Sequence, residues 1–119
     1  MTAKHLLAAN PDLLTEAELS GLVAEIARLG GWTLRYHTLR SKGSAHGFPD
    51  WVFVHPAKQR IIFAELKSEK RHPTERQRDW LDGLSDLPNV EVYLWRPSDW
   101  DEIVHTLTGR RPIRKENAA

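Results

Sequence analysis

The stretch PDWVFVHPAKQRIIFAELK, residues 49–67, decides the fold. Two runs within it, 50–55 and 60–65, are rich in β-branched and aromatic residues, and they flank the four residues 56–59. Such runs on either side of a tight turn are typical of a β-hairpin. Because both strands carry apolar residues on both faces, we expect them to be central strands of a sheet, covered by helices on either side.

The length of the turn decides which residues of the hairpin face each other. With Ala57 and Lys58 at the centre of the turn, counting outward along an antiparallel ladder places Asp50 directly opposite Glu65. Opposed Cβ atoms lie roughly 4.5 to 5.5 Å apart, so two carboxylates there repel each other unless a cation lies between them or one is protonated. Lys67 follows on the same face as Glu65. The pair therefore predicts a divalent metal site, although a one-residue bulge would shift the register.

The rest of the chain alternates helices and strands around this hairpin. Two helices open with a capping box, at Thr15 and at Thr74, and continue with apolar residues at helical spacing. The buried stripe of the second helix is expected to be Trp80, Leu81, Leu84 and Leu87. In chain order we expect a short helix at 5–9, a helix at 16–29, a half-buried strand at 32–37, the hairpin, a helix at 75–87, a strand at 90–95 and a helix at 97–108. This order predicts an α/β sandwich around a mixed sheet of about four strands.

Length and composition are those of one ordinary globular domain. The chain has 119 residues, of which 40% are hydrophobic and 28% charged, and we expect residues 1–109 to form the domain and 110–119 a basic, disordered tail. The absence of cysteine excludes disulfides, thiolate zinc sites and cysteine nucleophiles within this sequence. No apolar run approaches the roughly 20 residues that span a bilayer, and the N-terminus lacks the pattern of a signal peptide, so a cytoplasmic protein without a membrane partner is expected.

The charges are unevenly distributed along the chain. Residues 35–78 contain ten Lys and Arg against four Asp and Glu, whereas residues 79–108 contain one against seven. The basic part includes the carboxylate pair of the hairpin, which favours a site for a polyanion such as DNA. The alternative is a solvated basic face with no partner.

Several motifs together resemble the PD-(D/E)xK nuclease superfamily and, within it, the VRR-NUC (virus-type replication-repair nuclease) domain. The resemblance extends from Glu16 to about Leu107. The segments that carry it are Glu18, GFPD at 47–50, FAELK at 63–67, TERQRDWL at 74–81 and WRPSDW at 95–100. It implies a restriction-endonuclease-like α/β/α sandwich.

The resemblance also implies roles for the hairpin residues. Asp50 and Glu65 would bind Mg²⁺ or Mn²⁺, with the backbone carbonyl of Leu66 as a further ligand, and Lys67 would orient or activate the attacking water. No small-molecule organic cofactor is implied. Hard oxygen ligands suit Mg²⁺, which agrees with this assignment.

Two further residues have competing interpretations. Glu18 corresponds to a helical acidic residue that reaches the metal in this family, but it also completes the capping box with Thr15. Gln77 corresponds to a polar residue near the scissile strand, but it also completes the box with Thr74. Candidate nucleic-acid contacts are Arg35, Arg40, Lys42, His46, Lys70 and Arg71. His37 and His55 are interpreted as ordinary strand residues.

The function that these observations predict is a metal-dependent DNA endonuclease that selects structure over sequence. By resemblance it would act as a homodimer on branched DNA such as four-way (Holliday) junctions, in a bacterial or phage-infected cell. Two alternatives stay open: a non-catalytic or partner-dependent DNA-binding module of the same fold, and a flap- or end-directed nuclease.

Overall fold

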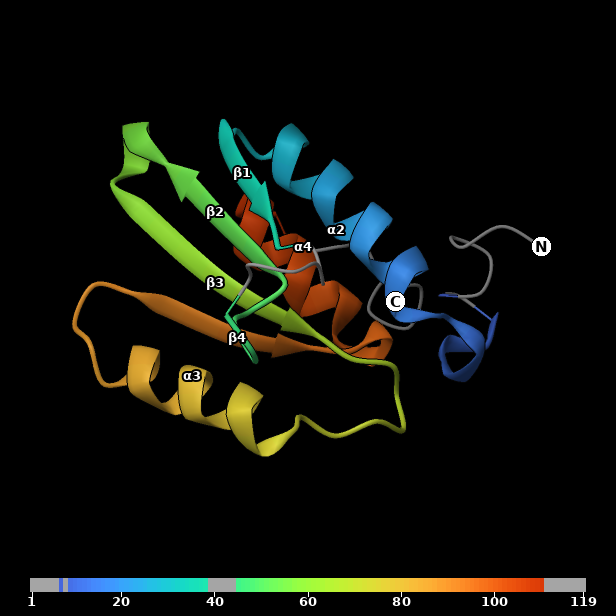
Figure 1. Ribbon diagram of the computed structural model, residues 1–119. Coiled ribbons are helices and arrows are strands. Elements are labelled where there is room, and N and C mark those ends of the chain that lie inside the picture. Colours follow the sequence, from blue (N-terminus) through green and yellow to red (C-terminus); the bar gives the residue numbers. More distant parts are fainter. Residues whose placement is uncertain (1–6, 8, 39–44, 111–119) are drawn as a thin grey trace.

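A computed structural model describes residue 7 and residues 9–38 and 45–110 (Figure 1). The elements are η1 (Pro11–Leu13), α2 (Glu16–Leu29), β1 (Leu34–His37), β2 (Trp51–His55), η2 (Pro56–Lys58), β3 (Arg60–Leu66), α3 (Glu75–Ser85), β4 (Glu91–Trp95), η3 (Pro97–Asp99) and α4 (Trp100–Thr108). The predicted helix at 5–9, the loop residues Arg40 and Lys42, and the tail beyond residue 110 lie wholly or mostly outside the described residues. No helix of the described part is long and apolar enough to cross a membrane.

The four strands form one mixed sheet in the order β1-β2-β3-β4. β1 and β2 are antiparallel, β2 and β3 are antiparallel, and β4 runs parallel to β3. The hairpin therefore supplies the two central strands, as predicted. The α/β fold with a mixed four-stranded sheet flanked by helices is confirmed (Figure 1).

The register of the hairpin also agrees with the count made from the sequence. His55 pairs with Arg60 and Trp51 pairs with Ala64, so the next step outward brings Asp50 opposite Glu65. The turn is a 3₁₀ segment, η2, that ends at Gln59 in the left-handed region, with φ 54° and ψ 47°. The connection has four residues, 56–59, in the structure as in the expected tight turn. The register is therefore the same although the turn is not of a primed type.

The two faces of the sheet are covered unequally. α2 and α4 pack together with the β2 and β3 side chains Phe53, Ile62, Ala64 and Leu66 in one buried core. α3 lies along β4, at one side of the sheet (Figure 1). The Phe48 ring contacts both Trp80 of α3 and Phe63 of β3, so α3 covers the face opposite to that of Ile62.

The predicted half-burial of residues 32–37 is wrong for the strand itself. All four residues of β1 are exposed, with Leu34 at 58% and Tyr36 at 59%, while Trp32 just before the strand is fully buried. β1 is an edge strand, and α3 lies at the opposite edge of the sheet, beside β4. No described helix therefore packs over Leu34 and Tyr36, and the alternation of the sequence does not become alternation of burial.

The predicted stripe of α3 is only partly buried. Leu81 is buried and Leu84 half-buried, whereas Trp80 is 36% and Leu87 51% exposed. The helix contacts the sheet chiefly at β4, which is too narrow a support to cover four apolar side chains. Both capping boxes form as predicted, at Thr15 and at Thr74.

Candidate active site

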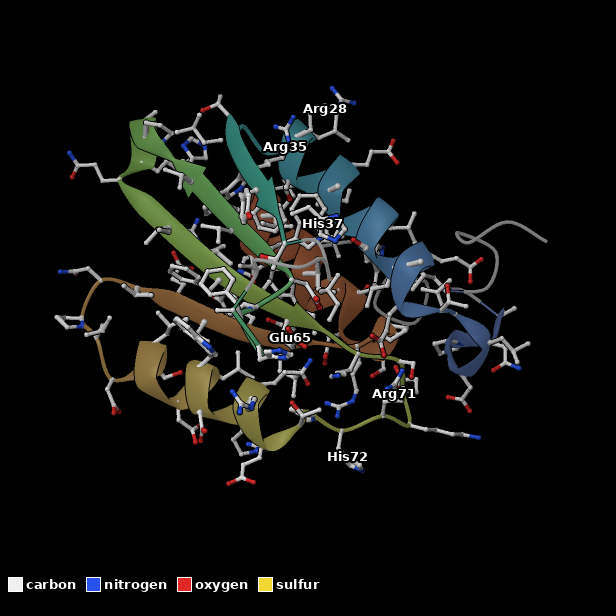
Figure 2. The ribbon with its side chains drawn as sticks, viewed as in Figure 1. Arg28, Arg35, His37, Glu65, Arg71 and His72 are labelled. Carbon is white, nitrogen blue, oxygen red and sulfur yellow. The ribbon has the colours of Figure 1, made fainter. Side chains whose placement is uncertain are left out.

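Glu65 and Lys67 lie at the end of β3, in the interior of the protein. Each side chain is only 1% exposed, and the Lys67 ammonium lies 3.8 Å from a Glu65 carboxylate oxygen. Figure 2 shows Glu65 between the strands and the first turn of α3. Two ionisable side chains are thus buried at one point, which is rare in an interior unless they are paired, and such groups are candidates for a functional site.

Asp50 comes to the same place from the start of β2. Its carboxylate accepts a hydrogen bond of 2.8 Å from the Leu66 backbone N–H, and its carbonyl accepts one of 2.8 Å from the Thr38 N–H. These bonds hold Asp50 between the end of β1 and the end of β3. The predicted pair of opposed carboxylates, with Lys67 beside them, is brought together.

The ionised form of Glu65 is electrostatically unfavourable at this position unless a further cation is bound. Both of its oxygens are buried, and neither has a hydrogen-bond partner among the described residues. Burial first and the nearby negative charge of Asp50 second raise the pKa of Glu65 to about 8, although the Lys67 ammonium acts in the opposite direction. A bound cation would compensate both the burial and the repulsion.

The donor set at this point fits Mg²⁺ or Mn²⁺. The described residues contain no cluster of three or more His, Cys, Asp or Glu side chains that could hold a metal. A cation held by the two carboxylates of Asp50 and Glu65 would keep positions open for waters and substrate. Mg²⁺ is usually held in this way, by one or two carboxylates and several waters, whereas structural zinc needs four nitrogen or sulfur ligands.

A pocket of about 360 Å³ opens beside Asp50. Its lining residues are Glu16, Ala17, Ser20, His37, Thr38, Asp50 and Leu66. The pocket is thus bounded by the first half of α2, the end of β1 and the end of β3. Asp50 is the member of the carboxylate pair that this pocket opens to solvent, whereas Glu65 lies buried behind it.

Glu16 is the acidic residue of α2 that lines this pocket, and sequence reasoning missed it. Its carboxylate accepts from the Ser68 N–H at 3.4 Å and lies 3.7 Å from the Arg71 guanidinium. Glu18 instead completes the capping box, because it accepts from the Thr15 N–H at 3.0 Å, and this bond lowers the pKa of its carboxyl group. The capping-box motif in the sequence could have indicated this, because a Glu18 carboxylate that accepts from the Thr15 N–H cannot also reach the pocket.

Gln77 likewise lies in a capping box. Its side chain accepts from the Thr74 N–H at 2.9 Å, while its own N–H donates to the Thr74 hydroxyl at 3.2 Å. It does not line the pocket. Of the two roles considered for Gln77, the structure shows the cap.

The predicted nucleic-acid contacts are dispersed around the site. Arg71 is nearest, through its ion pair with Glu16, while Lys70 and His46 are exposed. Arg35 donates to the Trp32 carbonyl at 2.7 Å and lies toward the start of β1 (Figure 2). Arg40 and Lys42 fall outside the described residues.

The segment that leads into Asp50 is fixed against α3. Gly47 has φ 82°, and a Cβ on it would lie 2.5 Å from the carbonyl carbon of Arg76. Only glycine allows both this conformation and this approach. Pro49 then passes into the interior, so Asp50 is positioned by a tightly packed segment.

Comparison with known proteins supports the fold. No family model matches the chain, and a search of curated proteins finds no match. Among solved structures, a VRR_NUC domain protein superposes with a TM-score of 0.54, at 16% sequence identity, over 78% of this chain and 84% of that one. The chain therefore has the fold of a VRR-NUC domain, as the motifs predicted. At this identity the likeness concerns the fold, and the activity must be argued from the site.

Proposed function

We propose that this protein is a nuclease that hydrolyses DNA phosphodiesters with Mg²⁺ or Mn²⁺. The observation that supports it best is the buried Glu65 carboxylate, which faces Asp50, adjoins Lys67 and has no hydrogen-bond partner in the described part of the chain. This arrangement occurs in a fold shared with a VRR_NUC domain protein and beside an open pocket. A structural ion pair alone would not require the second carboxylate.

In this proposal each residue of the site has a distinct task. Asp50, Glu65 and the Leu66 carbonyl would hold the cation, and the Leu66 N–H keeps the Asp50 carboxylate in place. A cation there would offset the charge that develops on the phosphate and would make a water molecule a better nucleophile. The Lys67 ammonium orients that water or donates to a phosphate oxygen.

In this proposal Glu16 has the role that the sequence had suggested for Glu18. It lines the pocket with Asp50, and its contacts with Ser68 and Arg71 connect α2 to the segment after β3. We propose that it reaches the cation through a water molecule, since the described residues contain no cluster of three carboxylates that could bind a metal together. Arg71, 64% exposed beside it, is the first candidate for a phosphate contact.

We further propose that the enzyme prefers branched DNA and acts as a homodimer. The described chain has no separate element for reading bases, which favours recognition of structure. The edge strand β1 exposes Leu34 and Tyr36, a surface suited to a second copy. A two-fold axis would let two sites nick opposing strands of a four-way junction. The mass in solution, measured for the wild type and for Tyr36→Arg, tests the dimer.

The test of the function is cleavage of labelled linear duplex, flap and four-way-junction DNA with Mg²⁺, Mn²⁺ or EDTA. We compare the wild type with Lys67→Met, which keeps the aliphatic stem, and with Lys58→Met, at an exposed lysine in the turn segment η2. Cleavage that needs the metal, is lost in Lys67→Met and persists in Lys58→Met is expected. If DNA is bound but never cut, a non-catalytic module is the better reading; cutting by Lys67→Met at the wild-type rate would refute the assignment of the site.

A further inference from the structure

His37 forms part of the pocket wall contributed by β1. It is the last residue of that strand, and it stacks on Trp51, with 4.4 Å between the ring centroids and 10° between the planes. The Trp51 indole N–H donates to the Ser20 hydroxyl at 2.8 Å, which ties this ring to α2. Figure 2 shows His37 at the end of β1 that adjoins α2. The imidazole is therefore solvent-exposed and held in one orientation.

Two hydroxyl groups near His37 can donate hydrogen bonds into the pocket. The Thr38 hydroxyl is buried and has no hydrogen-bond partner among the described residues. Ser20 accepts from Trp51, so its own proton is available to a group in the pocket. The carboxylates of Glu16 and Asp50 line the same pocket. A ligand with several acceptor oxygens could accept hydrogen bonds from the donors and, on its other side, contact a cation held by the carboxylates.

A phosphodiester has this chemistry, because its non-bridging oxygens accept hydrogen bonds and are drawn to a cation held by carboxylates. We infer that His37 contacts a non-bridging oxygen of the phosphodiester that enters the pocket, and that Thr38 adds a second contact. This inference rests on the proposed function, since it names a substrate-binding residue of the same site. A packing role is the competing explanation, because the ring also covers Trp51.

The experiment separates the ring nitrogens from the ring stack. His37→Phe keeps an aromatic ring on Trp51 but has no hydrogen-bonding nitrogen, whereas His37→Ala removes both. His72→Phe, at an exposed position in the connection after β3, is the matched control (Figure 2). The affinity for a flap and a four-way junction is measured with Ca²⁺ in place of Mg²⁺, followed by kcat and KM with Mg²⁺ and by the thermal midpoint.

We expect His37→Phe and His37→Ala to weaken DNA binding by about tenfold, as the loss of one hydrogen bond to a charged group does. KM should rise more than kcat falls, the midpoint of His37→Phe should match the wild type, and His72→Phe should bind normally. Thr38→Val should give a smaller loss. If His37→Phe binds as tightly as the wild type while His37→Ala does not, the ring only packs and the inference is overturned.

The outcome also distinguishes this inference from the proposed function. If the protein binds DNA in a His37-dependent way but never cuts it, hydrolysis fails and the phosphate contact stands. If it cuts DNA and His37→Phe matches the wild type in affinity and KM, hydrolysis stands and the contact fails. If it binds none of the DNA substrates with any cation, both are overturned.

Discussion

The Lys67 ammonium lies 3.8 Å from a Glu65 carboxylate oxygen, and both side chains are 1% exposed. That separation gives an ion pair without a hydrogen bond, so the lysine neutralises only part of the local charge. Asp50 adds a second negative charge at the same end of the hairpin. One ammonium thus faces two carboxylates in a poorly hydrated place, and the raised pKa of Glu65 follows from this imbalance.

The first prediction concerns stability in EDTA as the pH changes. In the folded protein the pKa of Glu65 is about 8, against 4.5 for the unfolded chain. Between these values the native state holds a proton that the unfolded state has lost, so this residue's contribution to stability falls as the pH rises from about 4.5 to 8. Compared with Glu65→Gln, the wild type should lose on the order of 3 kcal/mol of unfolding free energy over that range.

Urea unfolding at half-unit pH steps measures this difference. Glu25→Gln, an exposed position on α2, is the control and should follow the wild type. A wild-type curve parallel to that of Glu65→Gln from pH 5 to 8 would show that Glu65 is already ionised in the folded state.

The central hairpin was predictable because its signals are local. The turn length and the period-two direction of strand side chains suffice to bring Asp50 opposite Glu65, and the observed pairing of Trp51 with Ala64 agrees. The capping boxes at Thr15 and Thr74 are equally local. Elements whose signals lie within a few residues were therefore placed correctly, and so was the pairing that brings Asp50 opposite Glu65.

Features that depend on packing between distant elements could not be read from the sequence. Leu34 and Tyr36 alternate as a half-buried strand does, yet no described helix covers them, because α3 lies at the other edge of the sheet. Glu16 and Glu18 differ by two positions on one helix, and only the position of α2 against β3 brings Glu16 to the pocket. His37 reads as an ordinary strand residue until its stacking on Trp51 is seen.

The second prediction contrasts the two acids of α2. Glu16→Gln removes a charge from the pocket and should lower metal-dependent cleavage by about tenfold or more. Glu18→Gln keeps the capping box, since glutamine serves that position as well, and should cut normally. Rates measured at saturating DNA over a series of Mg²⁺ concentrations test the pair. A loss confined to Glu18→Gln would return the metal-binding role to Glu18.

The third prediction is stabilisation by the cation in the absence of DNA. A ligand that binds only the folded state adds about 2.7 kcal/mol at a concentration one hundred times its dissociation constant. Mn²⁺ at pH 8 should therefore raise the thermal midpoint of the wild type above its value in EDTA. Asp50→Asn should show little shift, whereas Asp82→Asn, exposed on α3, should respond as the wild type does. Equal midpoints in Mn²⁺ and EDTA would count against a preformed cation site.

The fourth prediction concerns the segment that delivers Asp50. Gly47→Ala forces a Cβ to within 2.5 Å of the Arg76 carbonyl carbon at a φ of 82°, and backbone atoms cannot move aside as a side chain can. We expect a loss of about 2 kcal/mol or more of unfolding free energy, together with reduced cleavage, because the segment between Gly47 and Asp50 must shift.

Gly83→Ala is the matched control. It lies within α3 with nothing inside 4 Å of its added Cβ, and it should stabilise the protein by about 0.5 to 1 kcal/mol without affecting activity. Denaturant unfolding and initial cleavage rates of the two variants test this prediction. If Gly47→Ala is as stable and as active as the wild type, the contact between Gly47 and the start of α3 does not position Asp50.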